Sequence, residues 1–135
     1  MRELNRAASE ALVAAHGAVH AATDVTGFGL SGHGWEMGDR SAVRLVVEGS
    51  ALPLYAGARA AAEAGVRTGG DPRNRDYLAG HTDGDADEVV EALAYDPQTS
   101  GGLLAAVDPS AVGELEGFTE IGRVVDGDPG VTLLA

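Results

Sequence analysis

The residues with the clearest chemical potential lie in the stretch HAATDVTGFGLSGHG, from His20 to Gly34. A single carboxylate, Asp24, stands there between a short apolar lead-in and a run of glycines. Mg²⁺ prefers oxygen ligands, and ATP sites usually combine a few carboxylates with phosphate oxygens and water. Charge neutralisation by such an ion is a large part of phosphoryl-transfer catalysis. Asp24 is therefore a candidate metal ligand, or alternatively the N-cap of a helix that follows it.

Hydroxyls and glycines around this carboxylate indicate a second kind of chemistry. Thr23, Thr26, Gly27 and Gly29 would offer hydroxyl and backbone N–H groups to phosphates at a helix start. The same composition is also typical of a tight crossing of two backbones, because glycine carries no side chain. Both interpretations stay open from the residues alone.

The stretch DPQTSGG (96–102) has the same ambiguity. Its first two residues indicate a turn, whereas Thr99, Ser100 and Gly101, with the next glycine, would form a nest of groups that binds an anion. A structural turn and a direct ligand contact are both compatible with the pattern.

Two other groups have a functional and a structural interpretation. His20 and His33 flank Asp24, and a carboxylate with two imidazoles would suit zinc or iron, although histidines beside apolar positions are often packed or exposed. Residues 73–75 (Arg73, Asn74 and Arg75) would reach a phosphate, since arginine grips it in bidentate fashion. Alternatively they pair with nearby acids.

Composition narrows the class of protein. The chain has 135 residues, 44% of them hydrophobic, which suits one globular domain with a real core. The chain has no apolar run long enough for a membrane span and no secretory layout at its start, so a cytoplasmic protein is expected. All nine basic residues are arginine, and cysteine is absent, which excludes thiol and lysine chemistry. A net charge of −12 argues against nucleic acid and anionic membranes as partners.

Hydrophobic periodicity predicts the elements that must position these residues. Helices are expected over residues 4–15, 28–37, 53–65, 85–94 and 109–117. Strands are expected over residues 18–23, 41–49, 102–107, 118–125 and 131–135. The first strand delivers Asp24 at its end, Asp85 is the expected cap of its helix, and glycines weaken the 28–37 helix. Residues 66–84 lack periodicity and are expected to form a long loop.

The order of these elements predicts the fold class. Helices and strands interleave, and the last two strands are expected to pair as a hairpin around a turn at 126–130. The pattern favours an α+β fold, a mixed β-sheet layered with α-helices, over a purely parallel sheet.

Two long segments also point to a family. HAATDVTGFGLSGHGWEM (20–37) and YDPQTSGGLLAAV (95–107) resemble the two signature stretches of the carboxy-terminal domain of selenophosphate synthetase, or selenide, water dikinase. LNRAASEAL before the first, and TGGDPRN (68–74) between them, resemble that domain in the same order. The similarity runs over nearly the whole chain, so residues 1–135 are expected to be one domain. It implies the carboxy-terminal fold of the aminoimidazole ribonucleotide synthetase-like (PurM-like) superfamily.

The resemblance also implies an activity and its cofactors. The reaction converts ATP, selenide and water into selenophosphate, AMP and phosphate, with Mg²⁺. Asp24 matches the single magnesium ligand that this domain contributes. The residues expected to contact ATP are Thr23, Thr26, Gly27, Thr99, Ser100 and Gly101. The expected partner is the amino-terminal ATP-binding domain of the same enzyme, which is a homodimer at full length.

The family pattern is incomplete here. Its amino-terminal domain carries a reactive cysteine or selenocysteine and a lysine, and this chain has neither cysteine nor lysine. No catalytic residue is therefore expected in the chain, which should be inactive alone. Two alternatives stay open: a stand-alone binding or interaction module, and the same domain of a related ATP-using enzyme. Such relatives are aminoimidazole ribonucleotide synthetase, thiamine-phosphate kinase and a hydrogenase maturation protein.

Overall fold

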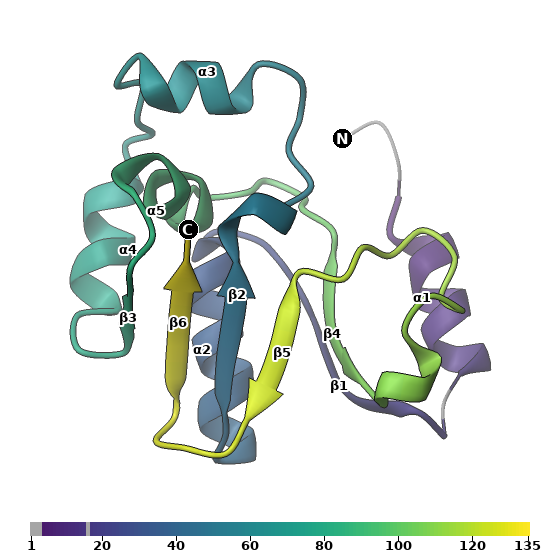
Figure 1. The fold of residues 1–135 in the computed structure, drawn as a ribbon. Coiled ribbons are helices and arrows are strands. Elements are labelled where there is room, and N and C mark those ends of the chain that lie inside the picture. The colour runs from purple at the N-terminus through teal and green to yellow at the C-terminus, as the bar shows by residue number, and fades with distance from the viewer. Residues whose placement is uncertain (1–3, 16) are drawn as a thin grey trace.

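The strands form two separate sheets in the computed structural model, which describes residues 4–15 and 17–135 (Figure 1). β1 (Val19–Asp24) pairs antiparallel with β4 (Leu103–Val107) as a two-stranded ribbon. The other four strands make one sheet in the order β3-β6-β2-β5: Thr82–Gly84, Gly130–Leu134, Arg44–Glu48 and Gly122–Val125. β2 is parallel to β6 and antiparallel to β5, so the sheet is mixed.

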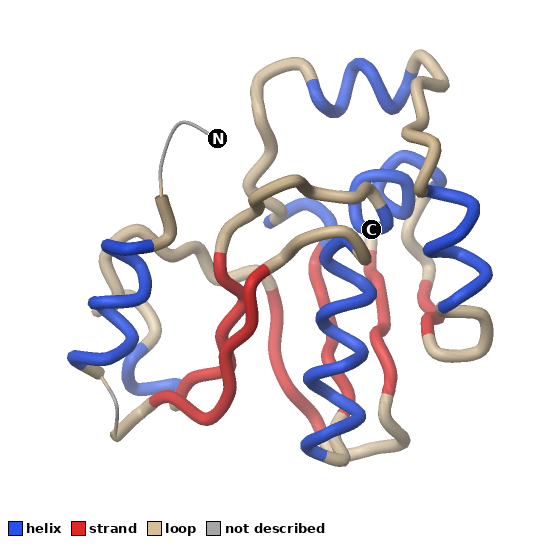
Figure 2. Tube along the Cα trace, turned by 180° about the vertical axis from the view of Figure 1, so that it is seen from behind, coloured by secondary structure: helices blue, strands red, loops and turns tan. Residues whose placement is uncertain are grey.

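Helices cover these strands. They are α1 (Arg6–Ala14), α2 (Gly29–Ser41), α3 (Ala58–Glu63), α4 (Asp71–Tyr77) and α5 (Glu88–Tyr95), with short 3₁₀ turns at Gly49–Ala51 and Pro109–Ala111. Figure 2 shows α2 running along one face of the four-stranded sheet, and α1 lies beyond the β1–β4 ribbon in Figure 1. The predicted α+β class, a mixed sheet layered with helices, is confirmed.

The core forms where α2 packs against the sheet and the ribbon. Its buried members are Val25, Met37, Leu45, Val47, Ala94, Leu104, Val131 and Leu133. Two glycines of α2 face this layer. A Cβ at Gly38 would lie 2.8 Å from the carbonyl oxygen of Val43, whereas one at Gly34 would meet only side-chain ends at 3.4 Å. Gly38 therefore lets the helix approach a backbone that any side chain would push away.

The predicted loop over residues 66–84 is wrong, because it contains α4 and β3. The buried residues of α4 are Asp71 and Asn74, so both of its inward positions are polar, and the apolar Leu78 follows only after the helix ends. Hydrophobic periodicity cannot detect such a helix. A signal was nevertheless present, since Pro72 stands in the first turn and Asp71 and Arg75 are four residues apart.

Three helix boundaries also differ from the prediction. The 53–65 helix is reduced to α3, because Gly57 has a φ of +85° that interrupts the helical backbone just before Ala58. The 109–117 helix is only a 3₁₀ turn, followed by Gly113 at φ +88°. The cap of α5 is Asp87, not Asp85, since its carboxylate accepts from the amides of Val89 and Val90 at 3.0 and 2.8 Å.

The predicted terminal hairpin is wrong as well. β5 and β6 both pair with β2, which lies between them, and not with each other. β2 carries Leu45, Val46 and Val47, all buried, which is the continuous apolar pattern of a central strand. The central, buried place of β2 therefore determines which strands pair, and the local turn signal at 126–130 does not.

The two glycines of α2 make a matched test of the close approach. Gly38→Ala should lower the free energy of unfolding by about 1–2 kcal/mol, since its Cβ strikes backbone. Gly34→Ala should be neutral or raise it by up to about 1 kcal/mol, because alanine is the better helix former. Urea unfolding followed by circular dichroism measures both. Equal effects at the two positions would contradict the packing argument.

Candidate functional site

Asp24 is the last residue of β1, and its side chain is exposed. Its Cα partner on the neighbouring strand is Leu103, the first residue of β4. The N-cap position of α2 is Phe28, and no side chain caps this end of the helix. The alternative role of Asp24 as a helix cap is therefore wrong, and its carboxylate faces solvent where the strand ends.

Backbone hydrogen bonds tie the two motif stretches together beyond this strand end. The amide of Val25 donates to the carbonyl of Gly102 at 3.0 Å, and the amide of Gly101 donates back to Val25 at 2.9 Å. The amide of Gln98 donates to the carbonyl of Thr26 at 2.9 Å. Residues 24–26 and 98–102, far apart in sequence, therefore form one hydrogen-bonded platform.

The side chain of Asn74, on α4, forms hydrogen bonds next to this platform. Its side chain is 4% exposed, and its amide nitrogen donates to the carbonyls of Gly27 at 3.0 Å and Tyr95 at 2.9 Å. Those carbonyls belong to the first motif and to the start of the second. The sequence analysis gave Asn74 two alternatives, a phosphate contact in a loop or a partner of nearby acids, and missed its hydrogen bonds to both motifs.

Arg75 is held by carboxylates of its own chain. Its guanidinium donates to Asp71 at 3.0 Å and Glu91 at 2.8 Å, and it lies 4.7 Å from the centre of the Tyr95 ring. Burial lowers the pKa of Arg75, but the hydrogen bonds to Glu91 and Asp71 outweigh this effect and raise it. The structural alternative, pairing with nearby acids, is confirmed for Arg75. Arg73 is exposed on the same helix.

The candidate ATP-contacting residues surround the platform in different environments. Thr99 and Ser100 are exposed in the loop before β4, and Gly27 is exposed at the turn before α2. Thr26 is half-buried, and its hydroxyl oxygen lies 2.9 Å from Nε2 of His33. The amide of Gly101 donates to the carbonyl of Val25, so it is not available to an anion nest in this stretch.

Gly29 serves the crossing of two backbones. Its φ is +69°, and a Cβ there would lie 2.8 Å from the carbonyl oxygen of Ala94 and 2.9 Å from the Tyr95 backbone. The start of α2 therefore abuts the end of α5, and the backbone-crossing interpretation is confirmed at this position. The Gly29 amide donates to the carbonyl of Thr26, so it does not face a ligand.

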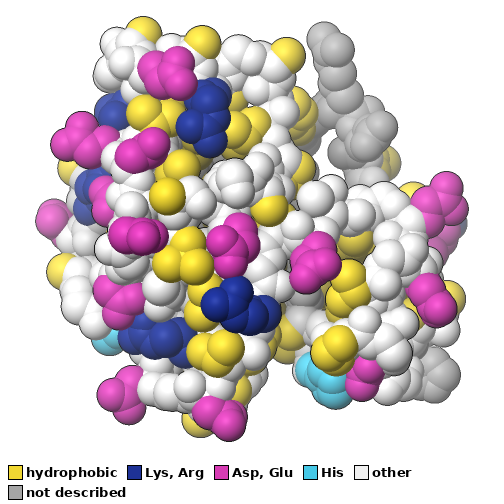
Figure 3. Space-filling view, in the orientation of Figure 1, with side chains coloured by type: hydrophobic (Ala, Val, Ile, Leu, Met, Phe, Trp, Pro, Cys, Tyr) yellow, Lys and Arg dark blue, Asp and Glu magenta, His cyan; other side chains and the backbone are white. Residues whose placement is uncertain are grey.

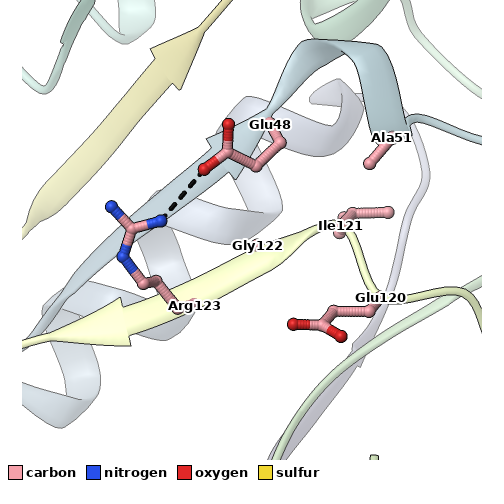
Figure 4. A pocket seen from close by; sticks show the side chains of 6 residues that line it. All are labelled: Glu48, Ala51, Glu120, Ile121, Gly122 and Arg123. Carbon is pink, nitrogen blue, oxygen red and sulfur yellow. Dashed lines mark hydrogen bonds and ion pairs between the residues drawn. The ribbon is translucent and has the colours of Figure 1, made fainter. Parts of the chain in front are cut away.

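Two shallow hollows mark the surface. One, of about 350 Å³, lies between β1 and α2 and is lined by residues that include Thr23, His33, Glu36 and Arg40. The other, of about 270 Å³, lies where β2 and β5 meet (Figure 4). Its polar feature is an ion pair of 2.9 Å between Arg123 and Glu48. Of these two hollows, only the first is lined by residues of the motifs, and Thr23 is the one among them that was named as a candidate ATP contact.

The predicted metal alternatives can be compared with the geometry. Within residues 4–15 and 17–135, no group of three or more His, Asp or Glu side chains is placed to hold a metal ion. The zinc or iron site of His20, Asp24 and His33 is therefore wrong. His33 is instead 8% exposed and bonded within the protein, and His20 is exposed.

An aromatic cluster borders the platform. Phe28 and Tyr77 stack with ring centres 5.0 Å apart and remain 43% and 41% exposed. Trp35 contacts Tyr77 edge-on and stacks on His81 at 4.3 Å, half-buried against the core.

Acidic side chains are spread over the face of the molecule seen in Figure 3.

The sequence that contains these two hydrogen-bonded motifs and the exposed carboxylate matches a known protein family. A profile of the family "AIR synthase related protein, C-terminal domain" matches residues 1–133. The chain belongs to this family.

Among the described helices, none is both long and apolar enough to pass through a bilayer.

Curated relatives in this family are named selenide, water dikinase. The protein of Caldanaerobacter subterraneus subsp. tengcongensis is 44% identical over 117 residues, which cover 85% of this chain and 33% of the relative. That of Burkholderia pseudomallei is 44% identical over 93% of this chain and 38% of its own length. That of Pseudomonas straminea is 38% identical over 96% and 39%. The chain thus spans about a third of the length of these relatives, and it matches the family model of a carboxy-terminal domain.

Solved structures confirm the fold of the family. AaThiL, solved with AMPPCP and TMP, matches with a TM-score of 0.54 at 18% identity, over 92% of this chain and 33% of that one. Thiamine-monophosphate kinase from Stenotrophomonas maltophilia K279a matches with a TM-score of 0.55 at 25% identity, over 87% and 32%.

The Asn74 clamp generates a stability prediction. Asn74→Asp should lower the free energy of unfolding by about 2–4 kcal/mol at pH 7, because an ionised carboxylate replaces two donations to carbonyls. Burial would raise the pKa of the new carboxyl, and its protonated form donates, so the loss should shrink as pH falls toward 5. Urea unfolding at both pH values measures this.

Asp76→Asn, on the exposed side of the same helix, is the control and should stay within about 0.5 kcal/mol of the native chain. Equal stability of Asn74→Asp and Asp76→Asn at pH 7 would show that Asn74 does not clamp the motifs.

Proposed function

We propose that this chain is the carboxy-terminal domain of an ATP-dependent selenophosphate synthetase, which makes selenophosphate, AMP and phosphate from ATP, selenide and water. The observation that carries the proposal is the 38–44% identity to selenide, water dikinases over most of the chain. The chain covers about a third of those proteins. Residues 1–135 therefore act as one domain. The reactive cysteine or selenocysteine and the lysine, which this chain lacks, belong to an amino-terminal ATP-binding domain.

Asp24 is proposed as the one Mg²⁺ ligand from this domain. An exposed carboxylate at a strand end fits a cation that is shared with groups from elsewhere, because the described residues contain no complete metal cluster of their own. Mg²⁺ commonly binds one or two carboxylates, with phosphates and water in its remaining positions. The ion would neutralise phosphate charge during transfer.

The platform is proposed as one wall of the ATP cleft. The exposed hydroxyls of Thr99 and Ser100 stand on the segment tied to residues 24–26, so they share the rigid frame of Asp24. Gly27 provides an open approach, since nothing lies within 4 Å of a Cβ built there. Thr23, Thr26 and Gly101 complete the proposed set around ATP.

The partner is proposed to be the amino-terminal domain of the same enzyme, in a cytoplasmic homodimer. The exposed Phe28–Tyr77 stack beside the first motif supports a docking face there, because contiguous exposed apolar surface often marks an interaction site. A stand-alone binding module would leave that stack uncovered. The same domain of a thiamine-phosphate kinase is the other candidate, and only the shared fold favours it.

Reconstitution tests the proposed function. A chimera of this chain behind the amino-terminal domain of the Caldanaerobacter relative should release AMP from ATP in a selenide-dependent manner, whereas the chain alone should release none. AMP and ADP are both measured by chromatography, with thiamine monophosphate replacing selenide as the control substrate. ADP formation that depends on thiamine monophosphate, with no AMP released in the presence of selenide, would overturn the assignment.

The metal role of Asp24 makes a sharper prediction. Asp24→Asn in the chimera should lower kcat/KM by about 100-fold, because the ion loses its only ligand from this domain. The free energy of unfolding should stay within about 0.5 kcal/mol, since Asp24 is exposed. Asp39→Asn, an exposed acid on α2, is the matched control and should keep full activity. Unchanged AMP release by Asp24→Asn would exclude the ligand role.

A further inference from the structure

Three side chains of the first motif and α2 form a continuous hydrogen-bonded row. The hydroxyl oxygen of Thr26 lies 2.9 Å from Nε2 of His33, and Nδ1 of the same ring lies 3.1 Å from Oε2 of Glu36. The other oxygen of Glu36 accepts from the hydroxyl of Tyr77 at 3.4 Å. His33 is 8% exposed, so this row runs from the surface through a nearly buried imidazole to the candidate site.

Chemistry of the groups determines where the protons lie in this row. An ionised carboxylate only accepts hydrogen bonds, so Nδ1 of His33 must carry the proton that faces Glu36. In the neutral ring Nε2 is then the acceptor. The Thr26 hydroxyl therefore donates to His33, and its one hydrogen is used inside the protein.

We propose that His33, oriented by Glu36, is a positioning residue that makes the Thr26 hydroxyl a pure hydrogen-bond acceptor toward the ligand. The proposal rests on the proposed function. A phosphate oxygen is itself an acceptor, so it gains nothing from such a hydroxyl. A water bound to a cation is a donor. Thr26, two residues after Asp24, would thus serve the proposed ATP–Mg²⁺ site by accepting from a water bound to the ion, and not by donating to a phosphate oxygen.

The proton positions can be measured on the chain itself, without any ligand. Long-range ¹⁵N–¹H spectra at about pH 8, where histidine is neutral, should show His33 with a protonated Nδ1 and a bare Nε2. The ring signals are assigned to His33 by through-bond correlation to its backbone, so the measurement needs no variant of the protein. A protonated Nε2 at that pH would overturn the proposal.

The second arm uses the chimera at saturating ATP. Thr26→Val should raise the Mg²⁺ concentration for half-maximal activity at least threefold while KM for ATP changes less than twofold. Thr26→Ser, which keeps a hydroxyl, should recover most of the Mg²⁺ response. His33→Gln should recover it too, because its amide oxygen accepts from Thr26, whereas His33→Leu should behave as Thr26→Val. A rise in KM for ATP with an unchanged Mg²⁺ response in Thr26→Val would contradict the proposal.

The two arms separate the possible failures. A chimera that makes no selenophosphate refutes the proposed function, while the ¹⁵N spectrum still reports the proton positions of His33. A spectrum with the opposite tautomer refutes the positioning role even if the chimera is active.

Discussion

The hydrogen bonds that join residues 24–26 to residues 98–102 are the constraint on which the candidate site depends. They extend the pairing of β1 with β4 past the strand ends, so both motif stretches become one body. Asn74 then fixes that body to the helical layer through Gly27 and Tyr95. An exposed carboxylate can bind a ligand at a defined place only if its backbone is held, and the backbone at Asp24 is held by its pairing with β4 while the side chain is exposed.

The same constraint explains one glycine in each of the two motifs. Gly29 lets the start of α2 abut the end of α5, and a Cβ at Gly101 would lie 2.5 Å from the carbonyl oxygen of Val25. These two glycines allow the backbones to meet, and their amides donate to carbonyls of the chain itself. Gly27 is different, because a Cβ there would meet nothing. A glycine-rich motif thus combines residues that serve packing with others that leave room for a ligand.

Much of the fold follows from the sequence, and the misses have physical reasons. The valine-rich β2 and the strand that ends in Asp24 are visible as local patterns, so they were predictable. α4 was not, because Asp71 and Asn74 fill its buried face and satisfy their bonds within the protein. The order of the strands in the sheet was not predictable either, because a turn signal between β5 and β6 does not reveal that β2 lies between them. At the candidate site, Asp24 and the nearby threonines and serine could be named from residue type and from the resemblance to the family, and their roles stay predictions. The link from Thr26 to His33 was not, because it depends on how the motif turns into α2.

The place of β6 in the sheet has a consequence for biosynthesis. β6 is an inner strand between β3 and β2, yet it consists of residues 130–134, which leave the ribosome after all the other strands. Until then β2 has only β5 beside it, and β3 has no neighbour. The nascent polypeptide must therefore keep these unpaired edges from associating with other chains. Closure of the sheet is a late, non-local event, which should make folding of this domain slow for its size.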